Sequence, residues 1–276
     1  MQTPGKQPAP QPEPGREHDE PEQPAQAPSQ LLTTRHRHVA QKQLLTLMAA
    51  HKGWGGDSGR GKQAMSAAIN HLLLLQELRL GGPADWGALA LFDRLPDRVA
   101  ERVARRCARQ LRRLGDVHAT LCGHFEQMRY ASGQLRALRD ELGNAAAAGG
   151  GEAAAEAPGG RLIYQVLTLG TAVDYAREMV AMYTKELVAK KLLLSALSEQ
   201  LERSEQPETT EDAEVDGEPT TLGRDLGAVY VSAWMLQPML PAARVDLIVT
   251  AFKSEVDDIG ALHGSPLPVS RAYDNA

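Results

Sequence analysis

A strict alternation of apolar residues between Leu162 and Leu201 constrains this chain more than any other feature of its sequence. In steps of four and three residues, eleven of twelve positions are apolar, and the exception is Lys190. Such a repeat places one apolar stripe along an α-helix, as in the seam of a coiled coil. We call it the second seam, and it consists of Leu162, Val166, Leu169, Val173, Ala176, Val180, Tyr183, Leu187, Lys190, Leu194, Leu197 and Leu201.

A first seam lies earlier in the chain and has ten positions, eight of them apolar. Pro96 and Asp97 are typical of a helix start, and no breaker stronger than a lone glycine follows before Gly143. The two seams predict two long helices that pair as an antiparallel hairpin, and pairing of the same seams between two chains is the alternative. The first seam consists of Ala104, Cys107, Leu111, Leu114, His118, Leu121, Phe125, Met128, Ser132 and Leu135.

Composition supports helices and argues against other classes. The 276 residues include 40 Ala and 36 Leu but only 12 aromatic residues, which argues against an all-β sandwich or barrel. Two Cys residues cannot form a disulfide scaffold of this size. No apolar stretch approaches the roughly 18 to 20 residues that span a bilayer, and no secretory signal is visible. We therefore expect an intracellular, soluble protein, and the net charge of −5 argues against wholesale nucleic-acid binding.

The predicted fold is all-α: an elongated antiparallel coiled-coil or helical bundle with a disordered N-terminal tail and an acidic loop. The predicted segments are a disordered Pro/Gln-rich tail (1–30), N-terminal helices that end in the long heptad helix (31–142), an Ala/Gly connector (143–160), the second long heptad helix (161–203), an acidic loop (204–221), a C-terminal helical pair (222–263) and a disordered tail (264–276).

Two further predictions concern helix breaks. Residues 53–61 are expected to form a Gly-rich loop between a helix at 31–51 and another at about 62–80. Pro238 and Pro241 are expected to divide the C-terminal pair into helices at 222–237 and 242–262.

Residues 56–63 also satisfy the G-x4-G-K pattern of a phosphate-binding loop. Gln63 stands where a Ser or Thr hydroxyl should bind Mg²⁺, and the preceding segment reads as a helix where a buried strand is required. The pattern therefore favours a loop between helices over a nucleotide site, and no cofactor is expected.

His118, Cys122 and His124 raise the question of a metal site, because the first two lie one helical turn apart. A structural zinc site needs four ligands, and Cys107 lies about 16 Å away along the same predicted helix. We expect no metal, and we interpret His118 as a polar core residue that sets the register of the seam. His36 and His38 are interpreted as a solvated basic cluster.

Eight arginines between residues 94 and 113 form the densest charge cluster, at positions 94, 98, 102, 105, 106, 109, 112 and 113. A solvated helix face, a contact with an acidic protein and a nucleic-acid contact are the open interpretations, in order of preference. No aromatic residue interleaves the cluster, which argues against single-strand binding.

Tyr230, Trp234 and Gln237 stand at i, i+4 and i+7 on one predicted helix face, and Pro238 ends that helix. Trp234 is expected either to anchor the core of the C-terminal pair or to be an exposed contact for a partner. No Ser/His/Asp, Cys/His or paired-carboxylate arrangement has a spacing that supports catalysis, so the chain is not expected to be an enzyme.

Two strings carry a resemblance to a known family. Residues 230–238 read Y-x-S-x-W-x-x-Q-P, and residues 182–187 read M-Y-x-K-E-L. Together with Arg244, they resemble the cyclin-dependent kinase 2-interacting protein family over residues 162–262. The Pro/Gln-rich tail, residues 53–61, the Ala/Gly connector and the acidic insertion depart from the family pattern.

This resemblance implies a non-enzymatic nuclear adaptor for DNA replication, the DNA damage checkpoint, the cell cycle and ribosome biogenesis. The implied partners are cyclin-dependent kinase 2, the origin-firing kinase, ATRIP, and an AAA+ ATPase complex with a second helical adaptor. The residues expected to contact partners are Tyr183, Lys185, Glu186, Tyr230, Trp234, Gln237 and Pro238. A self-associating structural coiled-coil protein of the centrosome or kinetochore type is the alternative.

Overall fold

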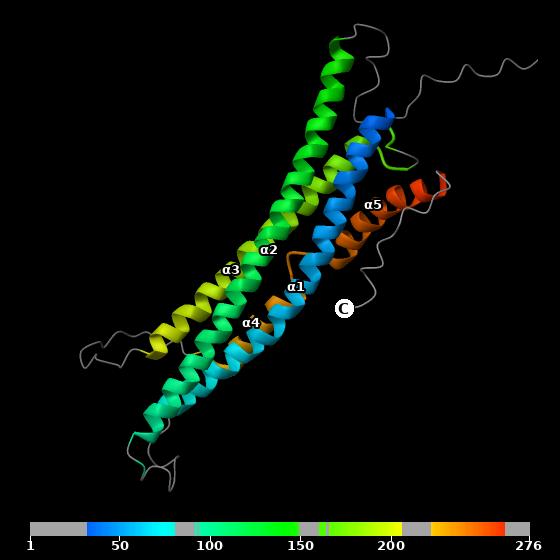
Figure 1. Cartoon of the computed structure of the whole chain (residues 1–276). Coiled ribbons are helices and arrows are strands. Elements are labelled where there is room, and N and C mark those ends of the chain that lie inside the picture. The colour runs from blue at the N-terminus through cyan, green and yellow to red at the C-terminus, as the bar shows by residue number, and fades with distance from the viewer. Residues whose placement is uncertain are drawn as a thin grey trace, which may run out of the picture. The chain divides into compact units, whose positions relative to one another are not determined.

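The part of the chain that the structure describes forms five α-helices that pack antiparallel (Figure 1). The computed structural model describes residues 32–80, 92, 94–148, 160–163, 166–205 and 222–262, all within the compact unit Leu31–Ala276. The helices are α1 (Thr34–Leu80), α2 (Leu95–Ala148), α3 (Leu169–Glu205), α4 (Arg224–Leu236) and α5 (Ala242–Leu262). The described residues contain no β-strand, so the predicted all-α helical bundle is confirmed. None of the described helices is long and apolar enough to span a bilayer.

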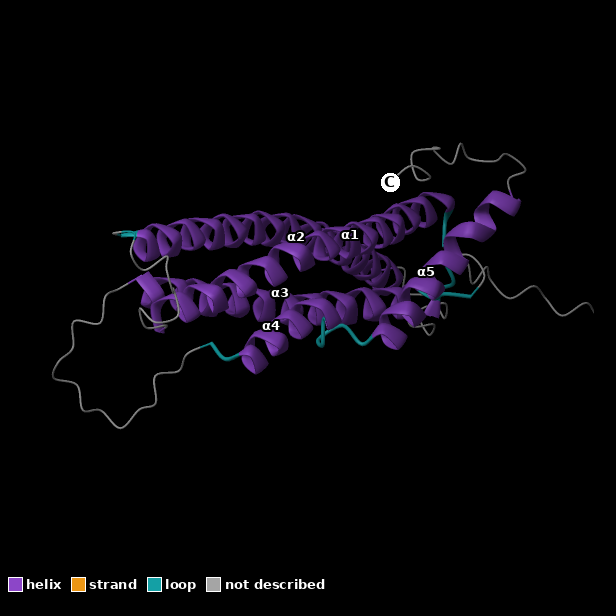
Figure 2. Cartoon of the chain, turned by 90° about the horizontal axis from the view of Figure 1, so that it is seen from below, coloured by secondary structure: helices purple, strands orange, loops and turns teal. Residues whose placement is uncertain are grey.

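The helix α1 contacts each of the other four helices. It runs alongside α2, while α3 packs against both, and α4 and α5 follow one another along α1 and α3 (Figure 2). The predicted pairing of the two heptad helices is therefore present between α2 and α3, but it is one part of a larger bundle.

The first seam is confirmed at all ten positions, because each of these side chains on α2 is buried or partly buried. The helix α2 extends past Gly143 to Ala148, so this glycine does not end it as predicted. Four further alanines extend the helix beyond it, in agreement with their high helix propensity.

The second seam is confirmed only from Leu169 onward, and the predicted helix start at residue 161 is wrong. Thr168 caps α3, since its Oγ1 accepts a hydrogen bond of 3.1 Å from the Thr171 N–H. Val166, a predicted seam residue, lies before this cap with 73% of its surface exposed. The backbone N–H groups of Val166 and Leu167 donate instead to the carboxylate of Glu255 on α5, at 3.3 and 3.0 Å.

The predicted loop at residues 53–61 is also wrong, because α1 passes through it as one continuous helix of 47 residues. Close packing explains the glycines at the two ends of this segment. A Cβ atom at Gly61 would lie 2.5 Å from the Trp234 ring, and one at Gly53 would lie 2.4 Å from the His124 ring. Tertiary contacts with these rings stabilise a helix that the local sequence alone disfavours by about 1 kcal/mol per glycine.

The C-terminal pair agrees closely with its prediction. Helix α4 ends at Leu236 because Gln237 adopts the left-handed conformation, with φ 48° and ψ 62°, and α5 begins after Pro241. The predictions for the two terminal tails, the middle of the Ala/Gly connector and most of the acidic loop fall outside the described residues.

Apolar side chains form two core clusters, one towards each end of α1. One cluster joins the first half of α1, the second half of α2, the first half of α3 and α5. The other joins the second half of α1, the first half of α2, the end of α3 and α4. Between them, the segment of α1 around Asp57 and the segment of α3 around Glu186 bring buried polar groups together.

Candidate functional site

The main candidate site is the level of the bundle where the two apolar clusters meet, which we call the polar layer. All four helices that build it contribute polar or aromatic side chains. The polar layer consists of His51, Trp54, Asp57 and Ser58 from α1, His118 and His124 from α2, Tyr183, Glu186 and Lys190 from α3, and Trp234 and Gln237 at the end of α4.

Tyr183 is fully buried within the polar layer. Its hydroxyl oxygen lies 2.5 Å from Nδ1 of His51, and its ring meets that of Trp54 edge-on, with centroids 4.9 Å apart. Burial raises the pKa of the Tyr183 hydroxyl, so it stays neutral at physiological pH. Burial also lowers the pKa of His51, although the negative charge of Asp246 opposes that effect. These two groups therefore form a neutral hydrogen-bonded pair.

Two tryptophans connect α1 to the end of α4. The Nε1–H of Trp54 donates to Oε1 of Gln237 at 2.8 Å, and the Nε1–H of Trp234 donates to the backbone carbonyl of Ser58 at 3.2 Å. Both indole donors are thus paired inside the protein, as buried indoles require. The first of these bonds also uses the side chain of the residue whose left-handed backbone ends α4.

A buried ion pair holds the turn between α4 and α5 against α3. Nζ of Lys190 lies 3.1 Å from Oε1 of Glu186, and the two side chains are 0% and 1% exposed. Lys190 also donates to the backbone carbonyl of Trp234 at 2.9 Å and lies 4.3 Å from that ring centroid. The backbone N–H of Met239 donates to Oε2 of Glu186 at 3.2 Å. Burial lowers the pKa of Lys190, and Glu186 counteracts this effect.

The three residues that raised the question of a metal site do not converge. Sγ of Cys122 lies 3.8 Å from Nδ1 of His118, but His124 faces α1, where its Nε2 lies 2.7 Å from Oδ2 of Asp57. Arg60 also pairs with Asp57. Among the described residues, no three His, Cys, Asp or Glu side chains are grouped so as to hold a metal ion.

The G-x4-G-K pattern lies in the middle of α1. Inside a helix, each backbone N–H donates to the carbonyl four residues earlier, so these amides are not free to surround phosphate. The helical geometry is therefore incompatible with a phosphate-binding loop.

The structure places the predicted partner-contact residues at different depths. Those that are buried are Tyr183, Glu186 and Trp234; Tyr230 and Gln237 are partly buried, and Lys185 and Pro238 are exposed. Full burial of Trp234 favours the core interpretation over an exposed contact. The two strings that carry the family resemblance are nevertheless brought together, because Glu186 of one bonds to Met239, which directly follows the other.

No protein-family model matches the chain, and no curated protein matches it either. Function is therefore inferred from the polar layer and from the surfaces that it positions.

Several residues of the polar layer were not predicted from the sequence, among them Trp54, His51 and Asp57. One signal was available, since His118 and Lys190 are polar members of the two apolar seams. These seam positions lie close together in the structure: Nε2 of His118 is 3.4 Å from the backbone carbonyl of Leu187, one turn before Lys190. Two of the three polar exceptions in the paired seams, His118 and Lys190, therefore marked the level of the layer, whereas the third, Ser132, lies outside it.

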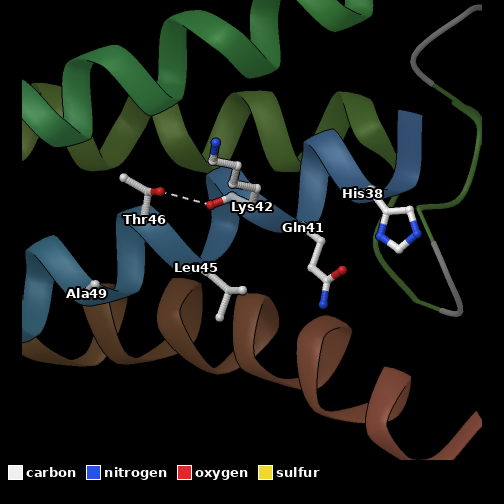
Figure 3. Close-up of a pocket in the computed structure, with 6 residues that line it drawn as sticks. All are labelled: His38, Gln41, Lys42, Leu45, Thr46 and Ala49. Atoms are coloured by element: carbon white, nitrogen blue, oxygen red, sulfur yellow. Dashed lines mark hydrogen bonds between the residues drawn. The ribbon is translucent and has the colours of Figure 1, made fainter. Parts of the chain in front are cut away.

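A shallow pocket of about 390 Å³ lies on the outer face of α1. Figure 3 shows Leu45 and Gln41 directed toward the neighbouring α5, while Thr46 donates to the backbone carbonyl of Lys42 at 2.9 Å. Its lining residues are His38, Gln41, Lys42, Leu45, Thr46 and Ala49. They include no carboxylate and no thiol, so the pocket holds neither an acid–base carboxylate pair nor a thiol nucleophile.

Apolar side chains are exposed along α4 and the turn that follows it. We call this surface the α4 apolar edge, and it consists of Val229, Met235, Leu236 and Met239. Leu236 is the most exposed of them, at 76%. The polar layer fixes the position of this edge, because Lys190 and Glu186 hold the backbone of Trp234 and Met239 on either side of Leu236.

Proposed function

We propose that the chain is a non-enzymatic nuclear adaptor related to the cyclin-dependent kinase 2-interacting protein family. The observation that carries this proposal is the meeting, in the polar layer, of the two strings on which the resemblance rests. Trp54 links them, since it packs on Tyr183 of one string and donates a hydrogen bond to Gln237 of the other.

Arg244, which continues the resemblance into α5, has a matching structural role. Its guanidinium donates two hydrogen bonds to the carboxylate of Glu178 on α3, at 2.7 and 2.6 Å. These bonds lower the pKa of Glu178. Several residues of the resemblance thus share one task, which is to fix α4 and α5 on the long helices: Glu186 and Arg244 link them to α3, and Trp234 and Gln237 link α4 to α1. A shared task of this kind supports a common architecture.

In this proposal, partners bind to surfaces that the polar layer positions and not to its buried side chains. The α4 apolar edge is the best candidate, because clustered exposed apolar side chains are typical of protein contacts. The proposed partners are the AAA+ ATPase complex with its second helical adaptor, cyclin-dependent kinase 2, the origin-firing kinase and ATRIP. The proposed processes are DNA replication, the checkpoint response and ribosome maturation.

The alternative of self-association through the two seams receives less support. All ten positions of the first seam are covered within one chain, mostly by α1 and α3. Pairing of the same residues between two chains would require the bundle to open, at the cost of exposing that core. We therefore expect a monomer, which light scattering of the purified chain measures.

Affinity purification from cells with mass spectrometry tests the adaptor proposal. The wild type is compared with the double variant Leu236→Ser/Met239→Ser on the α4 apolar edge and with Leu192→Ser on α3, a matched control that is 65% exposed. We expect the AAA+ ATPase and the kinase partners with the wild type and the control, and a loss with the double variant. Circular dichroism checks that all three chains fold.

Two outcomes contradict the proposal. Absence of both an AAA+ ATPase and a checkpoint or cell-cycle kinase from the wild-type sample removes the family assignment. Equal recovery with the double variant removes the α4 apolar edge as the docking surface.

A further inference from the structure

The first turns of α2 carry an unusually basic surface, which we call the arginine face. It consists of Arg98, Arg102, Arg105, Arg106, Arg109, Arg112 and Arg113, and all seven are exposed. The opposite side of the same turns buries Val103, Ala104 and Cys107 in the core. The arginines therefore lie on the outer surface of the bundle.

Carboxylates of the described residues leave most of this charge unpaired. Only Arg105 of the seven has a described carboxylate within 4.0 Å, that of Glu101 at 3.6 Å. The positive charge also affects a residue of α1. Burial lowers the pKa of His71, and the charges of Arg106 and Arg109 lower it further. Such a concentration of like charge is costly unless an anion binds to it.

The chain itself contains a complementary segment, residues 206–221. This segment has six carboxylates and no Lys or Arg. The six are Glu208, Glu211, Asp212, Glu214, Asp216 and Glu218. The acidic segment and the arginine face thus carry opposite charges.

The residues that flank the acidic segment lie at the same end of the bundle as the arginine face. Leu201, before the segment, and Leu222, after it, are buried in the same apolar cluster as Ala104 and Cys107. Arg224 pairs with Glu77 near the end of α1 at 3.1 Å, which holds the start of α4 at that end. Figures 1 and 2 agree that the end of α3 and the start of α2 lie side by side.

The acidic segment is long enough to reach the whole arginine face. Its 16 residues span at most about 53 Å when extended. Because both ends are held at the same end of the bundle, the middle of the segment can lie up to about 26 Å from them. The arginine face from Arg98 to Arg113 is about 22 Å long at the rise of an α-helix. A tether of this length gives an effective concentration on the order of millimolar, far above that of a separate acidic protein.

We propose that residues 206–221 bind the arginine face of their own chain, with their carboxylates accepting hydrogen bonds from the guanidinium groups. A tethered acidic polypeptide fits this surface better than a single-stranded nucleic acid does, because no aromatic residue between positions 94 and 113 is available to stack on bases. An acidic partner must then compete with the chain's own segment. This inference is independent of the adaptor proposal, since neither the α4 apolar edge nor any cellular partner enters it.

A binding assay on the full-length chain tests the proposal. The probe is a fluorescent synthetic peptide of residues 204–221, and its affinity for the wild type is compared with that for the variant E208Q/E211Q/D212N/E214Q/D216N/E218Q. Because that variant lacks its own competitor, we expect it to bind the probe at least about tenfold more tightly at low salt. The difference is expected to vanish at about 0.5 M salt, where exposed charges are screened.

Matched arginine variants locate the site. Added to the neutralised chain, Arg102→Gln/Arg106→Gln/Arg109→Gln is expected to abolish probe binding. The control Arg35→Gln/Arg136→Gln/Arg177→Gln removes three exposed arginines from other surfaces and is expected to leave it unchanged. Circular dichroism confirms folding, which exposed substitutions preserve.

Three results overturn the proposal. Equal probe affinity of the wild type and the neutralised chain shows that the acidic segment does not occupy the surface. Equal loss with the control arginines shows that the contact is not confined to the arginine face. An oligonucleotide that binds the wild type as tightly as the neutralised chain assigns the surface to nucleic acid.

Discussion

Lys190 of α3 donates a hydrogen bond of 2.9 Å to the backbone carbonyl of Trp234, in the last turn of α4. A cation at this position satisfies a carbonyl that the helix itself leaves free and interacts favourably with the helix dipole. Glu186 compensates the charge of Lys190, since burial of an unpaired ammonium would be strongly unfavourable. The pair therefore connects α3 to the part of the chain that carries the α4 apolar edge.

Removal of Lys190 alone is expected to destabilise the protein strongly. Lys190→Met leaves Glu186 buried without its partner, and such changes cost about 3 to 5 kcal/mol. The double variant Lys190→Met/Glu186→Gln removes both charges and can keep the bond to Met239, so we expect a smaller loss. Urea denaturation of the two variants and of Glu186→Gln measures the coupling. If the losses of unfolding free energy in the two single variants simply added in the double variant, the contact between Lys190 and Glu186 would be contradicted.

The glycines of α1 are expected to respond to alanine in opposite ways. Gly61→Ala places a methyl group against the Trp234 ring and should cost about 1 to 3 kcal/mol. Gly59→Ala meets no atom within 4 Å and should stabilise the helix by about 0.5 to 1 kcal/mol. Thermal unfolding by circular dichroism distinguishes the two. If residues 53–61 formed a loop, the two substitutions would not have opposite effects on stability.

The effect of replacing Gln237 on the free energy of unfolding is expected to depend on whether Trp54 is present. Its left-handed backbone costs about 1 to 2 kcal/mol for a residue other than glycine, while its side chain accepts the Trp54 hydrogen bond. In the wild type, Gln237→Gly relieves the strain but leaves a buried indole unpaired, which costs about 1 to 3 kcal/mol. In a Trp54→Phe background that penalty is absent, so the same change should stabilise by about 1 kcal/mol. A double-mutant cycle by urea denaturation tests this reversal; equal effects in both backgrounds would disprove it.

Acidification is expected to destabilise the bundle through two partly buried histidines. Burial lowers the pKa values of His51 and His118 below the ordinary value. As the pH falls through the ordinary histidine range, the unfolded chain therefore binds protons that the folded chain does not, and the free energy of unfolding decreases. The Tm should be lower at about pH 5 than at about pH 7.5. His51→Gln should reduce this difference, and an unchanged pH dependence would exclude His51 as a source.

The sequence predicted those parts of the fold that depend on local periodicity. The ten positions of the first seam are covered, and α5 has the predicted bounds, because a heptad repeat and a proline act within a few residues. The start of α3 was missed because Leu162 and Val166 continue the apolar period. The helix begins only after Thr168, which caps it, and Glu255 of α5 binds the backbone of the preceding residue. No local sequence pattern reveals this contact with a distant helix.

The polar layer could be predicted only in part, for the same reason. Glycine propensity indicated a break in α1, and the contact that removes the break comes from Trp234. The string around Trp234 was recognised as important, but Ser58, whose backbone carbonyl accepts the Trp234 hydrogen bond, lies 176 residues away in the sequence. Pairing between such distant residues requires the three-dimensional structure.

The continuous helix α1 is stabilised by a residue that is translated much later than α1 itself. Translation releases the glycines of α1 early, whereas the Trp234 ring that covers Gly61 emerges only when most of the chain has been synthesised. Until then, the middle of α1 lacks the Trp234 contact that offsets its low helix propensity, and a product that stops before α4 never gains this contact. Limited proteolysis of a chain ending at residue 221 should therefore cut between Gly55 and Gly61, where the full-length protein resists. The last fifth of the chain is thus expected to decide whether its first helix forms without a break.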